Sequence, residues 1–421
     1  MSLGARRNTH SVALDEPHAA VEKELGLNIA EQYQEEASIS WNTGFVKTLL
    51  ARARAVYLGA LVMASVAGTG CGGGGSPTAS SCLSGGNSDA IISALARAGI
   101  AELCQGAAFS ADKPIHLSDG QQIFTVGYPA STSAQALIQV AAGATFNEPM
   151  IQTYTAKHVE IRNVHLDGNR GTNPYTYSQA LIAVAGDSDV LDGVTATNTA
   201  GLSAIAAADN PNCDGLRITN NHIADNGFHT GSGTPWANGI DLRCSDAYVA
   251  HNEVRNATDG GISFYGGRNT VIEQNLVVNS ERSAYSGIIA ADLFASDFTG
   301  SIVRNNTIET CCGQHLHIAL AIGTHPWCDD ANPAGDCQFA TGVTFEDNSG
   351  TGTYGFGVVV DGMYNATVQG NNLVMTQWPS QACQTTNENA YVVNLAHASG
   401  TFDPGYANRQ VHWPCLGPIN Q

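Results

Sequence analysis

Short apolar segments recur along the chain, and each of them bends at an asparagine. The repeated pattern is apolar-x-x-Asn-x-apolar, so that two apolar positions flank a polar turn. The asparagine position is occupied by Asn221, Asn252, Asn275, Asn306, Asn348 and Asn371, and in two earlier copies by Val164 and Gly193. Successive copies are 23 to 42 residues apart. A minimum spacing with variable additions indicates one structural repeat with loops inserted into some copies.

A third apolar segment lies within each copy of the repeat. It begins with a small or turn residue followed by Ile or Val, as in "NGIDL" at 238, "GGISF" at 260 and "SGIIA" at 286. Three short strands cannot bury their alternating apolar faces alone, but successive copies stacked ~4.8 Å apart can. The pattern therefore predicts stacked three-strand coils, in which the asparagine amides bond to one another from coil to coil.

These repeats resemble the right-handed parallel β-helix of the pectate-lyase superfamily. The segment "NSDAIISALARAGIAELCQGAAF" at 87–109 is similar to the capping helix and first strand that open many such proteins, with Asn87 and Ser88 as N-cap candidates. The resemblance implies an all-β fold of about eight to ten three-strand coils over residues 82–400, with a short N-terminal capping helix.

Composition and charge restrict the partners. The 46 Gly and the low share of charged residues, 13%, suit short strands joined by tight turns. The net charge of −19 argues against a nucleic-acid partner. It also repels a polyanionic polysaccharide, unless bound cations or a local basic patch offset the field.

The chain before residue 82 predicts an export region. Residues 46–71 resemble a bacterial lipoprotein signal, because basic residues precede an apolar run that ends in small residues and Cys71. Residues 1–45 are interpreted as a mis-annotated or disordered upstream extension, and 72–81 as a Gly/Ser-rich tether. We therefore expect lipidation at Cys71 and an exported protein, either a periplasmic or cell-surface lipoprotein or a secreted one, that meets a membrane only through its lipid. The alternative is a cytoplasmic tail before a membrane anchor.

The cysteines predict a disulfide framework. Eleven cysteines less Cys71 leave an even number, as expected in an oxidising compartment. Cys213 lies five residues before Ile218 and Cys244 five before Val249, so this pair occupies one position on neighbouring coils, within disulfide range. The other predicted pairs are Cys328–Cys337 across an inserted loop, Cys383–Cys415 with the C-terminal tail at 401–421, and Cys82–Cys104 at the start, which leaves Cys311 and Cys312 as adjacent partners. A zinc site in the Cys/His-rich segment 311–337 is the rival interpretation, but its spacing fits no standard ligand pattern, so no metal site is predicted.

The third strands also predict an outward face that carries candidate catalytic and binding residues. We expect Ile240, Ile262, Ile288, Ile318 and Val358 to be aligned and to point inward, so that the rows beside them point outward. One such row would contain Gly239, Gly261, Gly287, His317 and Gly357, a glycine floor that a ligand could approach closely.

The predicted catalytic residues lie in the row beside this floor. Asp259, Tyr285 and His315 would follow one another on adjacent coils. The predicted substrate-binding residues around them are His317, Asp241, Arg243 and Tyr265. A phenol and an imidazole can serve as acid and base in β-elimination, while Asp259 can orient His315 or serve as the acid in hydrolysis. The plainer alternatives are a turn residue at Asp259 and solvated strand residues at the two histidines.

Known catalytic motifs of the superfamily are only partly present. The aspartates of the polygalacturonase motifs fall at Asn238, Asp259 and Gly260, and the histidine falls at Ser286, so a single carboxylate survives. Residues 82–400 contain only two lysines, Lys113 and Lys157, both near the start of the repeats, which argues against a lysine base. The resemblance to calcium-dependent lyases leaves calcium as the cofactor to consider.

Three functions are compatible with these residues. The favoured one is a monomeric, carbohydrate-active enzyme, a polysaccharide lyase or hydrolase acting along the outward strand face. The alternatives are a polysaccharide-binding protein without chemistry and a structural β-helix at the cell surface.

Overall fold

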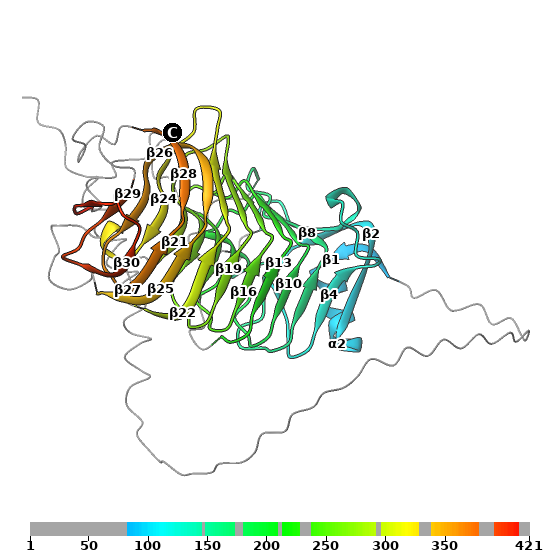
Figure 1. Cartoon of the computed structure of the whole chain (residues 1–421). Coiled ribbons are helices and arrows are strands. Elements are labelled where there is room, and N and C mark those ends of the chain that lie inside the picture. The colour runs from blue at the N-terminus through cyan, green and yellow to red at the C-terminus, as the bar shows by residue number, and fades with distance from the viewer. Residues whose placement is uncertain are drawn as a thin grey trace, which may run out of the picture. The chain divides into compact units, whose positions relative to one another are not determined.

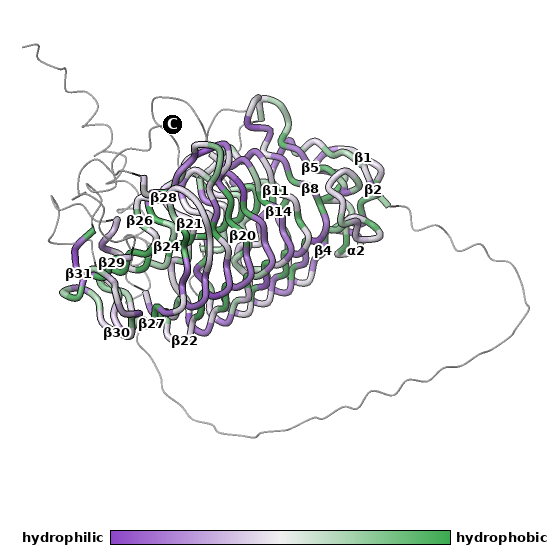
Figure 2. The backbone as a smooth tube through the Cα atoms, turned by 45° about the horizontal axis from the view of Figure 1, so that its top comes forward, coloured by the Kyte–Doolittle hydropathy of each residue, from purple (hydrophilic) through white to green (hydrophobic). Residues whose placement is uncertain are grey.

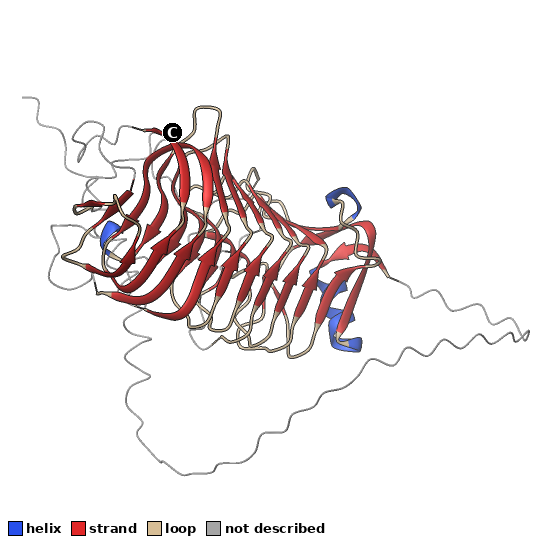
Figure 3. Ribbon diagram, in the orientation of Figure 1, coloured by secondary structure: helices blue, strands red, loops and turns tan. Residues whose placement is uncertain are grey.

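The computed structural model describes residues 82–144, 148–172, 180–208, 213–227, 237–291, 296–327, 338–378 and 391–411. They belong to the second of two compact units, residues 76–421. Strands of this unit pair in parallel from coil to coil, as Figures 1 and 3 show. The predicted right-handed parallel β-helix is therefore confirmed. No helix within the described ranges is long and apolar enough to cross a membrane.

Three ladders of strands run along the unit, and each coil contributes a strand to each ladder. The first ladder contains the beginning of β2 (Ile100–Ala111), β4 (Gln122–Thr125), β7 (Glu160–Arg162), β10 (Val190–Asp192), β13 (Arg217–Thr219), β16 (Tyr248–Ala250), β19 (Val271–Glu273), β22 (Asp297–Arg304), β25 (Ala340–Glu346), β27 (Met363–Gln369) and β30 (Ala398–Phe402). The second contains β1 (Leu83–Asn87), the end of β2, β5 (Ala136–Val140), β8 (Val164–Asp167), β11 (Thr195–Thr197), β14 (His222–Ala224), β17 (Glu253–Arg255), β20 (Leu276–Asn279), β23 (Thr307–Thr310), the beginning of β26 (Ser349–Val360) and β28 (Asn372–Gln377). The third contains β3 (Ile115–His116), β6 (Ile151–Gln152), β9 (Ala180–Ala183), β12 (Ser203–Ala207), β15 (Asn238–Leu242), β18 (Gly260–Phe264), β21 (Ala284–Ala290), β24 (Leu316–Ile322), the end of β26, β29 (Tyr391–Val393) and β31 (Ala407–Asn408).

The core fills the space between the ladders. In the first ladder the middle residue of each short strand points inward and the residues beside it point outward, as strand geometry requires. The inward row Ile161, Leu191, Ile218, Val249, Ile272 and Val303 is aligned in register and fully buried. Burying each of these side chains stabilises the fold by about 1.5–3 kcal/mol. Figure 2 shows apolar and polar positions recurring in step along successive coils.

The asparagines at the bends form the predicted amide ladder. Each Nδ2 donates to the Oδ1 of the asparagine on the next coil, from Asn221 to Asn252, Asn275, Asn306, Asn348 and Asn371, at 2.8–2.9 Å. The same Nδ2 group also donates to a backbone carbonyl. Asn275 Nδ2, for example, donates to the Val249 carbonyl at 3.0 Å. These side chains are buried and their amides are satisfied, so the polar bend costs little desolvation energy.

The residue before each ladder asparagine adopts the left-handed conformation, which turns the asparagine side chain inward. These residues are Asn220, His251, Gln274, Asn305, Asp347 and Gly370, with φ between 53° and 66°. Asn, Asp and Gly tolerate this region best, which accounts for their frequency at the bends.

One position of the repeat alignment was wrong by a residue. Leu191 pairs with Ile161 and Ile218, so Val194, rather than Gly193, is equivalent to Val164 and Asn221. Gly193 instead occupies the left-handed position before the bend, with φ 66°. The amide of Val194 donates to Asn221 Oδ1 at 2.9 Å, so the ladder ends on a backbone donor.

The N-terminal end of the coils is covered by helix α2 (Ser88–Ala98), as predicted (Figure 3). Asn87 is its N-cap residue, although its side chain makes no capping hydrogen bond, and Gly99 ends the helix in the left-handed conformation. Ile91 and Leu95 are buried in the main core, so the helix shields the first coil. Two short 3-10 helices complete the secondary structure within the described ranges, η1 (Thr132–Ala134) and η2 (His325–Trp327).

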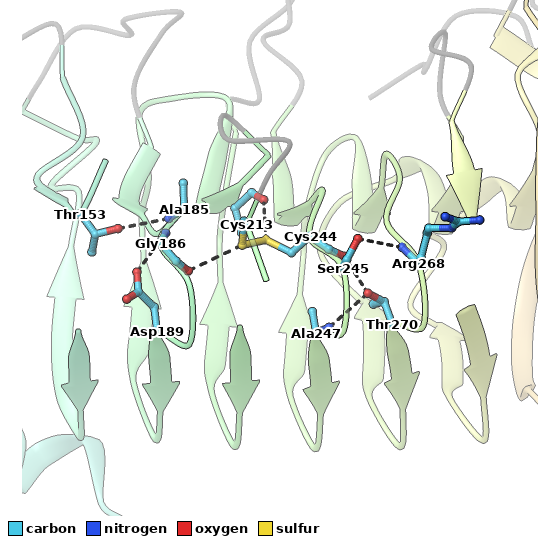
Figure 4. The surroundings of a disulfide bond; sticks show 11 residues. Thr153, Ala185, Gly186, Asp189, Cys213, Cys244, Ser245, Ala247, Arg268 and Thr270 are labelled. Carbon is cyan, nitrogen blue, oxygen red and sulfur yellow. Dashed lines mark hydrogen bonds between the residues drawn. A yellow bond between two sulfur atoms is a disulfide. The ribbon is translucent and has the colours of Figure 1, made fainter. Parts of the chain in front are cut away.

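Two of the predicted disulfides are present. Cys213 and Cys244 are bonded between neighbouring coils with a Cα–Cα distance of 4.7 Å, and Cys82 is bonded to Cys104 at 5.0 Å. Figure 4 shows the first bond among turn residues that hydrogen bond to one another; Thr270 Oγ1 donates to the Cys244 carbonyl at 2.7 Å. Both bonds fit an extracellular, oxidising compartment.

The remaining cysteine predictions have different outcomes. Cys311 and Cys312 are free thiols rather than a pair, with their sulfur atoms 2.9 Å apart. The predictions for Cys71, Cys328, Cys337, Cys383 and Cys415 lie outside the described residues. Past residue 400, β30 and β31 continue the ladders as far as Asn408, so coil structure extends into the expected C-terminal tail.

Candidate functional site

The register of β24 differs from the expected alignment by two residues. Ile288 pairs with Leu320, whereas the repeat pattern had aligned it with Ile318. Tyr285 consequently lies beside His317, and His315 lies beside Ser283. Asp259 does lie beside Tyr285 as predicted, because Gly260 pairs with Ser286, but His315 is not the next residue of that row. Both Ile318 and Leu320 of β24 are large apolar residues that could align with Ile288. Because β21 and β24 are each seven residues long, the sequence pattern allowed either register.

The predicted glycine floor points inward. A Cβ at Gly239, Gly261 or Gly287 would clash with core side chains of the second ladder, respectively Val254, Val277 and Ile308. All three of those side chains are fully buried. The glycines thus relieve crowding where the second and third strands of a coil meet, and they do not form a ligand surface.

The outward rows of the third ladder differ in polarity along the helix axis. On β21, β24, β26 and β29 the outward row is apolar, with Ile289, Ala321, Val359 and Val392 in register. These side chains are buried in a cluster separate from the main core, together with Trp327 and Val411. These side chains are therefore not accessible to a ligand.

On the preceding strands β15 and β18, the same outward row is polar, with Asp241 and Ser263 in register, whereas β12 contributes Ala206. Asn238 Oδ1 accepts hydrogen bonds from the Gly260 amide at 2.7 Å and from Ser263 Oγ at 2.8 Å. Asn238 Nδ2 donates to the hydroxyl of Tyr265 at 3.2 Å, and this hydroxyl donates to Asp241 Oδ1 at 3.4 Å. These residues, with Ser203, are called the polar cluster below.

The polar cluster combines fixed geometry with access to solvent. Asn238 and Ser263 are buried, whereas Asp241 and Tyr265 are half-buried. Ser203 Oγ donates to the second carboxylate oxygen of Asp241. The buried amide therefore orients the phenol, the phenol and a serine orient the carboxylate, and the two reactive groups remain within reach of a ligand.

Arg243, which was predicted to bind substrate, lies next to the polar cluster at the end of β15. It is half-buried and follows Asp241 by two residues, directly after β15 ends at Leu242. The register places it beside Tyr265, because Leu242 pairs with Phe264. Three of the predicted site residues, Asp241, Arg243 and Tyr265, therefore lie at the polar cluster.

The predicted residues Tyr285, His315 and His317 form a second, aromatic cluster with Trp378. The His315 ring stacks on Trp378 with a centroid distance of 3.9 Å, and the Tyr285 ring meets His317 edge-on at 5.1 Å. His315 Nδ1 hydrogen bonds Ser283 Oγ at 2.9 Å. Only 1% of His317 and 6% of His315 is exposed, and neither ring nitrogen of His317 has a hydrogen-bond partner among the described residues.

Burial lowers the pKa values of both imidazoles. Desolvation lowers the pKa of His315 to about 4, and desolvation with the neighbouring His315 lowers that of His317 to about 3. Both rings are therefore neutral at pH 7, which suits a base, but their burial against Trp378 separates them from bulk solvent.

Asp259 is half-buried and stands apart from Asp241. Its amide donates to the Ala237 carbonyl at 3.2 Å, and Ala237 lies four residues before Asp241. Four residues along a strand and one coil across separate the two Cα atoms by roughly 14 Å. A pair of carboxylates for inverting hydrolysis lies ~6.5–9.5 Å apart, so Asp241 and Asp259 do not form such a pair.

Sequence reasoning missed several members of these clusters. Asn238 was noted only as a substitution of a polygalacturonase aspartate, yet it holds both Ser263 and Tyr265. Ser203 and Trp378 carried no signal, because they are far from the other members in the sequence and only the coil register brings them close.

Comparisons with known proteins find similar folds at low identity. No family model matches the sequence, and no curated protein matches it. The Dettilon tailspike protein is 14% identical with a TM-score of 0.40, over 69% of this chain and 64% of its own. A mannuronan C-5 epimerase A-module from Azotobacter vinelandii is 13% identical with a TM-score of 0.41, over 75% of this chain and 94% of its own. An exopolygalacturonase from Thermotoga maritima is 11% identical with a TM-score of 0.45, over 69% of this chain and 87% of its own.

Proposed function

We propose that this protein is a polysaccharide-acting enzyme whose polymer lies across β12, β15 and β18. The observation that carries the proposal is the contact between the Tyr265 hydroxyl and Asp241, which Asn238 orients on a half-buried outward face. A hydroxyl and a carboxylate side by side can exchange protons with a sugar, and buried partners hold both in place.

Elimination is the favoured chemistry. Tyr265 would protonate the leaving glycosidic oxygen, Asp241 would accept the C5 proton, and Arg243 would neutralise a uronate carboxylate. Hydrolysis by a carboxylate pair is less favoured, because Asp241 is the one carboxylate in the polar cluster as defined above. Calcium stays a proposal of the same kind, because Asp241 offers the oxygen ligands that this ion prefers.

The assignment of Asp259, Tyr285 and His315 as catalytic residues also stays a prediction. Its support is the neutral state of His315 at pH 7 and the aromatic contact between Tyr285 and His317. Its disadvantage is that the imidazoles are nearly inaccessible. The same experiment can compare both clusters.

The test is to incubate the full chain with a panel of polysaccharides and to record near-ultraviolet absorbance and new reducing ends. A lyase produces both signals, a hydrolase only the second, and a binding protein neither. On an active polymer, Tyr265→Phe should lower turnover by roughly 10²-fold. Tyr248→Phe is the matched control, because the Tyr248 hydroxyl bonds Glu273 at 2.8 Å on the first ladder and should not affect turnover.

Two results would change the proposal. Loss of activity in Tyr285→Phe and His315→Ala, with full activity in Tyr265→Phe, would move the chemistry to the aromatic cluster. Absence of both signals with every polymer would leave polysaccharide binding or a structural role, which pull-down on insoluble polymers separates.

A further inference from the structure

Three side chains that the polar and aromatic clusters do not use converge at the bends after the third ladder. His325 opens η2 after β24, Asp361 follows β26, and His397 precedes β30. One ligand atom of each lies within 4.8 Å of the other two. The three residues come from successive coils and are far apart in the sequence, so no sequence motif predicted that they lie together.

The distances among the three atoms are those of a ligand set. His325 Nδ1 and His397 Nδ1 are 2.9 Å apart, and they lie 3.3 and 3.4 Å from Asp361 Oδ1. Ligands ~2.05 Å from a tetrahedral zinc ion are about 3.3 Å from one another. The three atoms therefore occupy three corners of such a tetrahedron with only small adjustments.

The burial of Asp361 gives independent support. This residue is fully buried, and within the described ranges its Oδ1 accepts no hydrogen bond although it faces both imidazoles. A buried carboxylate oxygen that accepts no hydrogen bond is costly even with two imidazole nitrogens 3.3 and 3.4 Å away, and a cation bound between the three atoms would remove that cost. Its other oxygen accepts a hydrogen bond from Asn394 Nδ2 at 3.0 Å, which orients the carboxylate as outer partners orient metal ligands.

The backbone also holds the three ligands together. The His325 amide donates to the Asp361 carbonyl at 3.2 Å, and the Gly362 amide donates to the His397 carbonyl at 3.1 Å. A Cβ at Gly362 would come within 2.6 Å of the His325 ring, so glycine leaves the room that the imidazole occupies. The arrangement is thus set by coil register and is ready before an ion binds.

We propose that His325, Asp361 and His397 bind a divalent transition-metal ion. Imidazole nitrogens with one carboxylate suit zinc and its neighbours in the first transition row, whereas calcium prefers an all-oxygen shell. Three protein ligands leave a fourth position for water or another group. The site lies at the strand ends rather than on the polar cluster, so its existence does not depend on the proposed polysaccharide chemistry.

The test is a calorimetric titration of the full chain with Zn²⁺, after removal of any histidine tag and of bound metal with EDTA. We expect one Zn²⁺ per chain. His325→Ala should abolish binding, and Asn394→Ala should weaken it by 10- to 100-fold through the orientation of Asp361. The control His251→Asn removes an exposed histidine at a left-handed bend and should leave the affinity unchanged.

Two further measurements keep the result clear of folding defects. Asp361→Asn retains an acceptor for Asn394, and its far-ultraviolet circular dichroism should match the wild type while its Zn²⁺ affinity falls. Zn²⁺ should raise the midpoint of thermal unfolding of the wild type but not of His325→Ala, and Co²⁺ should give the visible absorption of a four-coordinate site. Equal Zn²⁺ affinity in wild type and His325→Ala, or no binding to the wild type, would overturn the proposal.

Discussion

The buried asparagines do two tasks at each bend. They satisfy backbone groups that the turn leaves inside the solenoid, and they tie each coil to the next. Asn306 illustrates both, because its Oδ1 accepts from the amide and from Nδ2 of Asn275 at 3.0 and 2.9 Å, and its Nδ2 donates to Ile272 and Asn348 at 3.0 and 2.9 Å. Asn305, next to it, is exposed and left-handed and takes part in none of these bonds.

We predict that Asn306→Ala lowers the free energy of unfolding by about 3 kcal/mol or more, because several buried donors and acceptors lose their partner. Asn305→Gly should change it by less than ~1 kcal/mol, since glycine accepts the left-handed conformation. Urea unfolding followed by circular dichroism measures both variants. Equal midpoints for the two would show that the amide ladder contributes little.

The two buried histidines predict a pH dependence of stability. Their folded pKa values, about 4 and about 3, lie below the unfolded value near 6.5. Above pH 6.5 both states are neutral and contribute no difference. As the pH falls, the unfolded chain takes up protons that the folded protein excludes, so stability should decrease, by about 2 kcal/mol for each imidazole at pH 5.

Comparison with a variant isolates this effect. Burial raises the pKa of Asp189 to about 6, which acts in the opposite direction because protonation is then easier in the folded state. His317→Phe should therefore show a smaller decrease in unfolding free energy between pH 7 and pH 5 than the wild type. The same decrease in both proteins would mean that His317 is not the group responsible.

A disulfide bond connects secondary-structure elements of two neighbouring coils. The Cys213–Cys244 bond joins the turn before β13 to the turn before β16, and its two cysteines are 31 residues apart. It adds a covalent link to a stack otherwise connected by strand pairing. Cys311 and Cys312 lie exposed after β23 and connect no elements.

We predict that the double variant Cys213→Ala, Cys244→Ala lowers unfolding free energy by about 3–4 kcal/mol, as loop closure of this length implies. Cys311→Ser, Cys312→Ser should leave it unchanged. Unfolding curves measure the stability, and peptide mapping without reduction should return a linked 213–244 pair. Free thiols at both positions would contradict the register that placed them side by side.

The whole protein carries a net charge of −19, which influences any polymer that approaches it. The Debye length is ~30 Å at 0.01 M salt and ~8 Å at 0.15 M, so repulsion of a polyanion is much weaker at the higher concentration. We predict that an anionic polysaccharide binds several-fold more tightly at 0.15 M than at 0.01 M salt. Fluorescence titration measures this, with a neutral polysaccharide as the control that should not respond. Tighter binding at low salt would show that Arg243 or another local cation dominates the approach.

Much of this fold could be predicted from the chain alone. Periodic bends at Asn221 to Asn371, alternating apolar residues and the helix signal at 87–98 are local patterns, and each recurs often enough to be self-consistent. Even the Cys213–Cys244 pair followed, because both cysteines keep a constant offset from aligned core residues. In a stacked solenoid, one repeat predicts the environment of the next.

The side-chain clusters were decided by tertiary structure. A two-residue shift of β24 placed His317, rather than His315, beside Tyr285, and Gly239 and its equivalents face core side chains of the second ladder rather than solvent. Strand alternation specifies faces only while the strand stays regular and its register is known. His325, Asp361 and His397 lie together because each occupies the bend after the third strand of its coil, and the three coils are successive. The sequence by itself determined the coil and its core, through local periodicity, whereas only the packing of coils decided which polar side chains meet.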